Sequence, residues 1–307
     1  MLSVIIPSYN EEAMIEKTAC AIAGVLSDAQ IPGEMIFVDD GSADKTWEEI
    51  GKLSDKIPML RGIHFSRNFG KEAAIMAGLA DASGNCCAVI DCDLQHPPEK
   101  LVEMYRLWEQ GYDIVEGRKS SRGKEGRLRS FSARVFYSII GTVTGFDMGK
   151  ASDFKLLDRR AVDIMINMPE KDAFFRALSS WIGFKSTYIE FDVKEREAGE
   201  SKWSAFALFK YALSNISSFS TAPMQIVTVL GAIMMVVSLV LGIIALIQKF
   251  SGQALGGFTT IILIQLFSSS IIMISLGIIG YYIAKIYEGS KGRPRYIISE
   301  TCGNKMS

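Results

Sequence analysis

The sequence predicts a mixed α/β domain with a mostly parallel sheet, followed by two apolar helices that form a hairpin. Two observations predict this. Strand-like and helix-like segments alternate through the first hundred residues. The charged residues are also distributed unevenly: residues 1–210 contain 27 Lys and Arg and 32 Asp and Glu, whereas the last 97 residues contain six basic and two acidic side chains. The chain therefore divides into a polar part and an apolar part.

The polar part begins with short apolar runs separated by segments with helical spacing. The expected elements, in order, are a strand at Ser3–Pro7, a helix at Ala13–Ala29, a strand at Glu34–Val38, a helix from about Lys45, a strand at Leu60–Phe65, a helix at Lys71–Ala82 and a strand at Cys87–Ile90. In such sheets ligands gather at the carboxyl ends of the strands. The functional site is therefore expected in the turns that follow them.

Two of these turns are acidic. Asp39 and Asp40 follow the second strand, and Asp91 and Asp93 follow the strand at Cys87–Ile90. Residues i and i+2 of a strand point to the same face, so Asp91 and Asp93 can converge on one ligand. Carboxylate oxygens suit Mg²⁺ or Mn²⁺ together with a diphosphate. The alternative is a solvated acidic turn, which is common for two aspartates at this spacing.

The apolar part contains two segments long enough to cross a hydrocarbon core of about 30 Å, Ile226–Ile247 and roughly Thr260–Ile283. The alternative, two core helices of a soluble protein, would need a large protein shell around them. The loop between the segments carries one charge, Lys249, whereas the tail at 284–307 is basic. The positive-inside rule then places the α/β domain and both termini in the cytoplasm, in a multi-pass protein of the cytoplasmic membrane.

A basic segment lies between the two parts. Arg118–Arg134 contains seven basic residues and one acidic residue, and Phe131–Phe146 is amphipathic. A solvated basic loop is the default interpretation of such a run. An interface helix at about 127–146 is the functional alternative, because anionic lipids attract basic amphipathic helices. A second amphipathic stretch at 203–225 leads into the first apolar segment, so the α/β domain is expected to span 1–202 and the hairpin 226–283.

Several ordered motifs resemble a known family. Val4–Glu12 and Val38–Thr46 resemble the opening of an inverting family-2 glycosyltransferase with the GT-A fold. Motifs in the rest of the chain are similar to the polyprenyl-phosphate branch, with its dolichol-phosphate mannose synthases and bactoprenol glucosyltransferases: Arg67–Ala74, Asp91–Glu99, Asp153–Arg159 and Arg196–Lys202. The segments Lys285–Tyr287 and Arg293–Tyr296 after the second apolar segment resemble the bactoprenol members.

The resemblance implies transfer of a sugar from a nucleotide-sugar to polyprenyl (undecaprenyl) phosphate with inversion, which gives a lipid-linked sugar for cell-envelope glycan modification. UDP-glucose is the first choice of donor, and UDP-N-acetylhexosamine, UDP-galactose and GDP-mannose stay open. A non-catalytic membrane scaffold that has kept the fold is the alternative from another class. The lipid bilayer is an expected partner, a homo-oligomer is possible, and no nucleic acid is expected.

The resemblance also implies the residues of the donor site. The nucleotide-sugar would contact Pro7, Tyr9, Glu11, Val38, Asp39, Asp40, Lys71, Asp91 and Gln95. Successive strand residues point to opposite faces, so one of Asp39 and Asp40 should contact the nucleotide while the other braces the turn; we prefer Asp40. The implied metal ligands are Asp91, Asp93 and Gln95, with Mg²⁺ or Mn²⁺ as the cofactor.

The implied catalytic residues are Asp93, Asp153 and Arg118, and those implied for the lipid phosphate or diphosphate are Arg134, Ser138, Arg196 and Lys202. A phosphate monoester is largely a dianion at pH 7, so the acceptor needs no strong general base. Positioning and charge neutralisation should therefore dominate. Asp153 is expected either to act as a base or orienting group, or to form a structural ion pair with Arg118 or Lys155.

Overall fold

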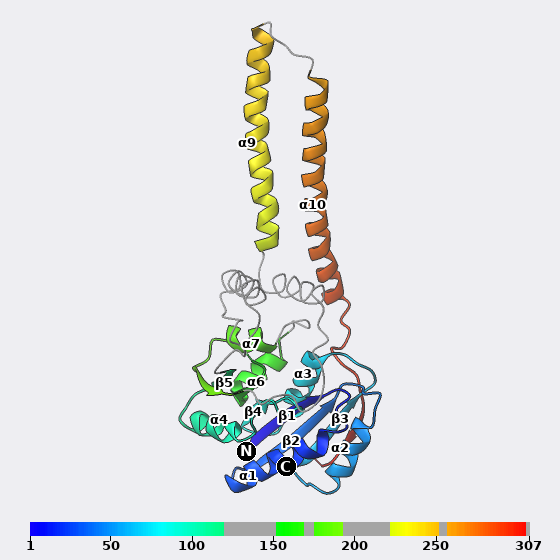
Figure 1. The fold of residues 1–307 in the computed structure, drawn as a ribbon, viewed down its shortest axis with the longest axis vertical. Coiled ribbons are helices and arrows are strands. Elements are labelled where there is room, and N and C mark those ends of the chain that lie inside the picture. The colour runs from blue at the N-terminus through cyan, green and yellow to red at the C-terminus, as the bar shows by residue number, and fades with distance from the viewer. Residues whose placement is uncertain (120–151, 169–174, 193–221, 252–256, 305–307) are drawn as a thin grey trace. The chain divides into compact units, whose positions relative to one another are not determined.

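The computed structural model describes residues 1–119, 152–168, 175–192, 222–251 and 257–304 (Figure 1). The chain forms two compact units. One comprises Met1–Ser204 together with Arg293–Ser307, and the other comprises Ala205–Gly292. The predicted interface helix at 127–146 lies outside the described residues.

The first unit is built on a mixed sheet. Its described strands are β1 (Leu2–Ser8), β2 (Gly33–Asp39), β3 (Leu60–Phe65), β4 (Cys86–Val89), β5 (Ile114–Lys119), β6 (Lys155–Asp158), β7 (Ser186–Phe191) and β8 (Ile298–Cys302), in the order β7-β5-β6-β4-β1-β2-β3-β8. The four strands β4, β1, β2 and β3 are parallel to their neighbours within this group. β6 and β8 run antiparallel on either side of them. The predicted α/β fold with a mostly parallel sheet is confirmed.

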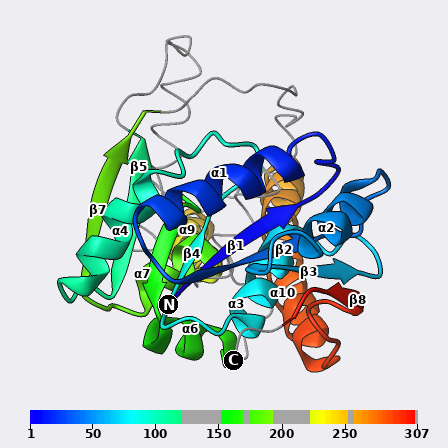
Figure 2. The same ribbon diagram turned by 90° about the horizontal axis from the view of Figure 1, so that it is seen from below.

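Helices cover both faces of the parallel strands. The described helices of this unit are α1 (Ile15–Asp28), α2 (Thr46–Ser54), α3 (Lys71–Asp81), α4 (Lys100–Glu109), α6 (Arg159–Ile166) and α7 (Phe175–Trp181). Side chains of α1, α2 and α4 share one core with alternate residues of β1 and β2, such as Val4 and Phe37. Figure 2 shows α1 and α3 on opposite sides of these strands.

Helix α3 packs closely on the opposite face. A Cβ atom at Gly78 would lie 2.5 Å from Cγ2 of Ile5 and 3.2 Å from Cγ2 of Val38. The glycine therefore allows the backbone of α3 to approach β1 and β2. This contact brings the first turn of α3, with Lys71 and Glu72, to the carboxyl ends of the strands.

The C-terminal segment differs from the expected basic tail at 284–307. Helix α10 continues to Ser290, and β8 (Ile298–Cys302) then pairs antiparallel with β3. The physical reason is the edge of the sheet: without β8, β3 would present a row of unpaired backbone N–H and C=O groups. The end of the chain is therefore part of the α/β unit.

The second unit contains two long helices, α9 (Ala222–Phe250) and α10 (Phe258–Ser290). Val227–Ile244 and Phe267–Ser290 are long and apolar enough to cross a membrane, and no residue in either stretch is buried within the structure. α9 starts at Ala222, so the expected juxtamembrane segment at 203–225 ends earlier than predicted, and its residues 203–221 lie outside the described ones. Both helices present large apolar side chains to their surroundings, including Met235, Leu239 and Met273.

Candidate active site

A pocket of about 290 Å³ opens at the carboxyl ends of β1, β2 and β4. It is lined by Pro7, Ser8, Tyr9, Glu11, Asp40, Asn68, Gly70, Lys71, Ala74, Asp91, Cys92 and Asp93. The parallel register explains why these residues meet, since Ser8 pairs with Asp39 and Ile5 pairs with Val89. The turns after these strands therefore lie at the same edge of the sheet.

Asp40 holds the loop that precedes α3. Its carboxylate accepts hydrogen bonds from the backbone N–H groups of Phe69, at 2.6 Å, and Gly70, at 2.9 Å. Burial raises the pKa of Asp40, and these two hydrogen bonds oppose the rise. Gly41 has a φ of +66°, and a Cβ there would lie 2.4 Å from the carbonyl carbon of Arg67. Glycine is therefore needed where the two loops meet.

Asp39 is fully buried and faces away from the pocket. Its Oδ1 accepts hydrogen bonds from the backbone N–H and the hydroxyl of Ser42, and its Oδ2 lies 2.7 Å from Nδ1 of His64. A carboxylate only accepts hydrogen bonds, so Nδ1 of His64 is the donor. Asp39 thus braces the turn while Asp40 lines the pocket, which is the arrangement that we preferred. The contact of either residue with a nucleotide stays a prediction.

The turn after β1 is tied to the turn after β2. The backbone N–H of Asn10 donates to Oγ of Ser42 at 2.9 Å, and the backbone N–H of Glu11 donates to Oγ1 of Thr46 at 2.9 Å. Asn10 has a φ of +55°, a conformation that asparagine tolerates better than most residues. These bonds fix the segment that carries Tyr9 and Glu11 into the pocket.

Asp91 and Asp93 lie in the loop after β4, because this strand already ends at Val89. The argument from alternating strand faces is therefore wrong for this pair. Both nevertheless line the pocket, since Cys92 between them is buried and its carbonyl accepts a 2.6 Å hydrogen bond from Oγ1 of Thr18. Gln95 donates its backbone N–H to Oδ1 of Asp93 at 3.1 Å and does not line the pocket.

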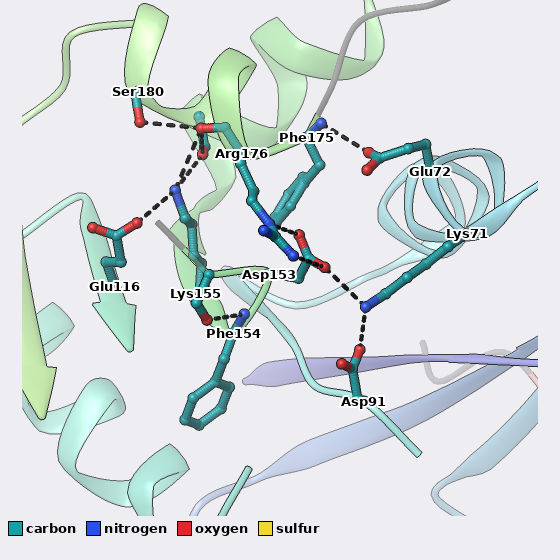
Figure 3. Close-up of polar contacts among 12 residues, drawn as sticks. Lys71, Glu72, Asp91, Glu116, Asp153, Phe154, Lys155, Phe175, Arg176 and Ser180 are labelled. Atoms are coloured by element: carbon teal, nitrogen blue, oxygen red, sulfur yellow. Dashed lines mark hydrogen bonds and ion pairs between the residues drawn. The ribbon is translucent and has the colours of Figure 1, made fainter. Parts of the chain in front are cut away.

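Lys71 joins the pocket to a row of charged groups (Figure 3). Its Nζ lies 2.6 Å from Oδ1 of Asp91 and 2.8 Å from Oδ2 of Asp153. Arg176 approaches the same Asp153 carboxylate, with Nε 2.6 Å from Oδ1 and Nη2 2.9 Å from Oδ2. Burial would raise the pKa of Asp153, but Arg176 and Lys71 outweigh it and hold the pKa below its usual range.

The structural partners expected for Asp153 were wrong. Lys155 is 2% exposed, and its Nζ lies 3.0 Å from Oε1 of Glu116. Arg118 places its Nε 3.1 Å from Oε2 of the same Glu116 and its guanidinium 4.2 Å from the ring centre of Tyr188. Glu116, on β5, binds both of these cations. Arg118 does not line the pocket, and its catalytic role stays a prediction.

Glu72 connects α3 to α7. Its Oε2 accepts a 2.8 Å hydrogen bond from the backbone N–H of Phe175, at the first residue of α7 (Figure 3). Burial, reinforced by the negative charge of Asp153, raises the pKa of Glu72 to about 7. Neither Glu72 nor Arg176 was predicted. Glu72 lies within the motif Arg67–Ala74 and Arg176 lies in none of the motifs, and their partners are 103 and 23 residues away along the chain.

Comparisons with known proteins identify the family. The model of glycosyl transferase family 2 matches residues 3–164. The chain belongs to this family. It is also 36% identical to the uncharacterized glycosyltransferase sll0501 of Synechocystis sp., over 98% of this chain and 96% of that protein. It is 33% identical to the bactoprenol glucosyl transferase of Shigella phage SfV, over 97% of each chain.

Solved structures similar to this glycosyltransferase include mannosyl-3-phosphoglycerate synthase from Rubrobacter xylanophilus, with 16% identity and a TM-score of 0.48, covering 71% of this chain and 72% of that one. Another is glucosyl-3-phosphoglycerate synthase from Mycobacterium tuberculosis in complex with Mn²⁺ and UDP-glucose, with 21% identity and a TM-score of 0.45, covering 69% and 75%. The family membership confirms the resemblance found in the motifs, and the mixed sheet is the architecture expected of a GT-A catalytic domain.

The donor atoms of the glycosyltransferase pocket fit a hard divalent cation. Among the described residues no group of three His, Cys, Asp or Glu side chains is arranged to hold a metal ion. Asp91 and Asp93, however, both present carboxylates to the pocket, while Cys92 is buried and its thiol lies 3.9 Å from the hydroxyl of Thr18. Two carboxylates suit Mg²⁺ or Mn²⁺ when a diphosphate and water complete the coordination. The expected cofactor is therefore compatible with these residues.

The pocket of the glycosyltransferase contains most of the predicted donor-site residues. The predicted residues outside its lining are Val38, Asp39, Gln95, Asp153 and Arg118. Val38 is fully buried beside Gly78, between the sheet and α3. The residues predicted for the lipid phosphate, Arg134, Ser138, Arg196 and Lys202, lie outside the described residues. Asn68, Gly70 and Ala74 line the pocket without having been predicted, although the motif Arg67–Ala74 contains them.

Proposed function

We propose that this family 2 glycosyltransferase transfers a hexose, with glucose from UDP-glucose as the first choice, to polyprenyl phosphate with inversion at the anomeric carbon. The observation that carries the proposal is the pocket in which Asp40, Lys71, Asp91 and Asp93 meet, in a chain that also carries two exposed apolar helices. Relatives named bactoprenol glucosyl transferases that align over nearly the whole chain support this acceptor.

The pocket divides into two regions with different chemistry. The turns at Tyr9–Glu11 and Asp40 would bind the nucleoside, because they combine an aromatic ring with carboxylate and backbone groups. Asp91 and Asp93 would hold Mg²⁺ or Mn²⁺, which when bound neutralises charge on the departing nucleoside diphosphate. Lys71 lies between Asp91 and Asp153, where its ammonium group can contact a phosphate of the donor or the acceptor.

Asp153 serves this reaction better as an orienting group than as a base. Both of its oxygens accept charge-assisted hydrogen bonds from Arg176 and Lys71, and its pKa is lowered. A carboxylate that is so strongly stabilised in its ionised form is a weak proton acceptor. The acceptor phosphate is already largely a dianion at pH 7, so its oxygen can displace the nucleoside diphosphate without losing a proton to the protein. A single displacement inverts the anomeric carbon.

The arrangement of the chain supports a membrane hairpin. Met1–Ser204, which precedes the helical unit, and Arg293–Ser307, which follows it, belong to one folded unit, in which β8 pairs with β3. Two helices that leave and rejoin one folded unit must return the chain to the side from which it started. Together with the basic residues of the tail, this supports an orientation with the α/β unit in the cytoplasm and the loop between the helices outside. The lipid phosphate would be bound by Arg134, Ser138, Arg196 and Lys202, as the motifs imply.

A donor screen tests the function. Membranes that contain the full chain are incubated with undecaprenyl phosphate, MnCl₂ and, separately, UDP-glucose, UDP-galactose, UDP-N-acetylglucosamine or GDP-mannose. The lipid fraction is analysed by mass spectrometry. We expect a hexosyl undecaprenyl phosphate with UDP-glucose. Absence of a lipid-linked sugar with all four donors would contradict the proposal and favour the scaffold alternative.

A further inference from the structure

The strand that follows the second apolar helix lies beside the turns that build the pocket. β8 pairs with β3 in a register that places Thr301 opposite Ile63 and Glu300 opposite His64. Two further hydrogen bonds extend the pairing: the backbone N–H of Ser66 donates to the carbonyl of Ile297 at 3.0 Å, and Oγ of Ser299 donates to the carbonyl of His64 at 3.1 Å. The C-terminal segment is thus attached to β3 from Gly62 to Phe65 and to Ser66 beyond it.

One set of contacts leads from this segment to Asp40. The ring of Tyr296 stacks on Phe65, with a centroid distance of 5.1 Å and an interplanar angle of 9°. Phe65 is fully buried and meets Phe69 edge to face at 5.8 Å. The backbone N–H of Phe69 donates to the carboxylate of Asp40 at 2.6 Å. Tyr296 therefore contacts the loop before α3 through one intervening ring, that of Phe65.

A second set of contacts starts at Glu300. Oε2 of Glu300 accepts a 2.9 Å hydrogen bond from Nε1 of Trp47, and the Trp47 ring stacks on His64 with a centroid distance of 5.1 Å. His64 in turn donates to the buried carboxylate of Asp39. Through these residues an exposed side chain of β8 supports a fully buried carboxylate beside the pocket.

Asp39 continues this set of contacts to the turn after β1. It accepts hydrogen bonds from the backbone and the hydroxyl of Ser42, and Oγ of Ser42 accepts a hydrogen bond from the backbone N–H of Asn10. Asn10 lies between Tyr9 and Glu11, which both line the pocket. The two sets of contacts thus reach the turn after β1 and the loop before α3.

We infer that Tyr296 and Glu300 are positioning residues of the donor pocket, so that nucleotide affinity depends on the C-terminal strand. The segment acts on the two loops through the contacts described above. Packed interiors transmit small displacements, and a pocket binds tightly only when its polar groups are held in place. This inference rests on the proposed function, because it takes the pocket to be a nucleotide site.

The test measures binding of UDP in the presence of Mn²⁺ by isothermal titration calorimetry, with the full chain in lipid nanodiscs. Tyr296→Ala removes the stacked ring, and Tyr296→Phe is the matched control that keeps it. Loss of the stacked ring should loosen the loop that carries Phe69, so we expect UDP to bind roughly two- to tenfold more weakly to Tyr296→Ala and as in the wild type to Tyr296→Phe. In transfer assays the KM for the donor should rise while kcat changes little.

A second pair of variants guards against a folding defect in Tyr296→Ala. Glu300 is exposed, so Glu300→Ala should leave thermal unfolding nearly unchanged while weakening UDP binding about two- to fivefold. Glu300→Gln keeps an acceptor oxygen for Trp47 and should bind UDP as the wild type does. If both alanine variants bind UDP as the wild type does, whatever their unfolding temperatures, this inference is wrong while the proposed function still stands. A wild-type chain that neither binds UDP nor forms product would overturn the proposed function and this inference with it.

Discussion

Arg176 holds both carboxylate oxygens of Asp153, from Nε to Oδ1 at 2.6 Å and from Nη2 to Oδ2 at 2.9 Å. Two parallel hydrogen bonds fix the plane of the carboxylate as well as its charge. Lys71 shares Oδ2 and extends the contact to Asp91, which lines the pocket. The orientation of Asp153 is therefore determined by a helix, α7, that does not itself line the pocket.

Replacing Arg176 tests the role of this orientation. Arg176→Lys keeps the positive charge, but an ammonium group cannot form the two parallel hydrogen bonds of a planar guanidinium. The Asp153 carboxylate is then no longer held in one plane. We expect kcat to fall about ten- to a hundredfold, with little change in the KM for the donor, in steady-state transfer assays. Ser180→Ala is the matched control on α7, since Ser180 is exposed and its hydroxyl bonds only the carbonyl of Arg176 among the described contacts. Equal kcat values for Arg176→Lys and the wild type would show that Asp153 needs no such support.

Glu72 makes the stability of the domain depend on pH. Its pKa is about 7 in the folded chain and 4.5 as the ordinary value, so between these values the folded state binds more protons than the unfolded state. Stability from this group is present below about pH 4.5 and is lost as the pH rises through about 7. Burial is the main cause of the raised pKa, and the charge of Asp153 adds to it. The Phe175 hydrogen bond, Lys71 and Arg176 oppose it.

Glu72→Gln removes the titration while keeping an acceptor for the backbone N–H of Phe175. We expect the variant to unfold at a temperature several degrees higher than the wild type at pH 8, and at nearly the same temperature at pH 5. Differential scanning fluorimetry in detergent at the two pH values measures the difference. A difference that does not change with pH would place the pKa of Glu72 near its ordinary value.

Local patterns in the sequence predicted the central part of the fold well. The apolar runs at Ser3–Pro7, Glu34–Val38 and Leu60–Phe65 became β1, β2 and β3, with ends that differ by no more than one residue. The carboxylates Asp40, after β2, and Asp91 and Asp93, after β4, were predicted to belong to the site because the carboxyl ends of parallel strands meet at one edge of the sheet. The convergence of Asp91 and Asp93 was anticipated for the wrong reason, since a loop fixed by the buried Cys92, and not a strand, brings them together.

Contacts between distant segments could not be predicted in this way. The partners of Asp153 are Lys71, on α3, and Arg176, on α7, whereas the two cations that were expected, Arg118 and Lys155, bind Glu116. β8 was expected to be part of a basic tail, because a five-residue strand with a charged residue at its centre has no strong pattern of its own. Its pairing depends on the open edge of β3, which becomes evident only after the sheet order is known.

The proposed topology predicts which residues a membrane-impermeant maleimide can reach in intact cells. Ser251, after the last residue of α9, would lie outside, whereas the exposed Cys20 of α1 would lie in the cytoplasm. We expect Ser251→Cys to be labelled in intact cells and the wild type to be labelled only after lysis. Labelling of wild-type Cys20 in intact cells at the rate seen after lysis would contradict a cytoplasmic α/β unit.

The most direct test of the account compares the wild type with Asp93→Asn in one transfer assay. The substitution removes a charge from the pocket but keeps an acceptor for the backbone N–H of Gln95, so the loop should stay folded. With undecaprenyl phosphate and the donor selected by the screen, we expect the wild type to form the lipid-linked sugar. The variant should be at least about a hundredfold slower, at an unchanged unfolding temperature. Equal product from both proteins would contradict the claim that this pocket carries out the transfer.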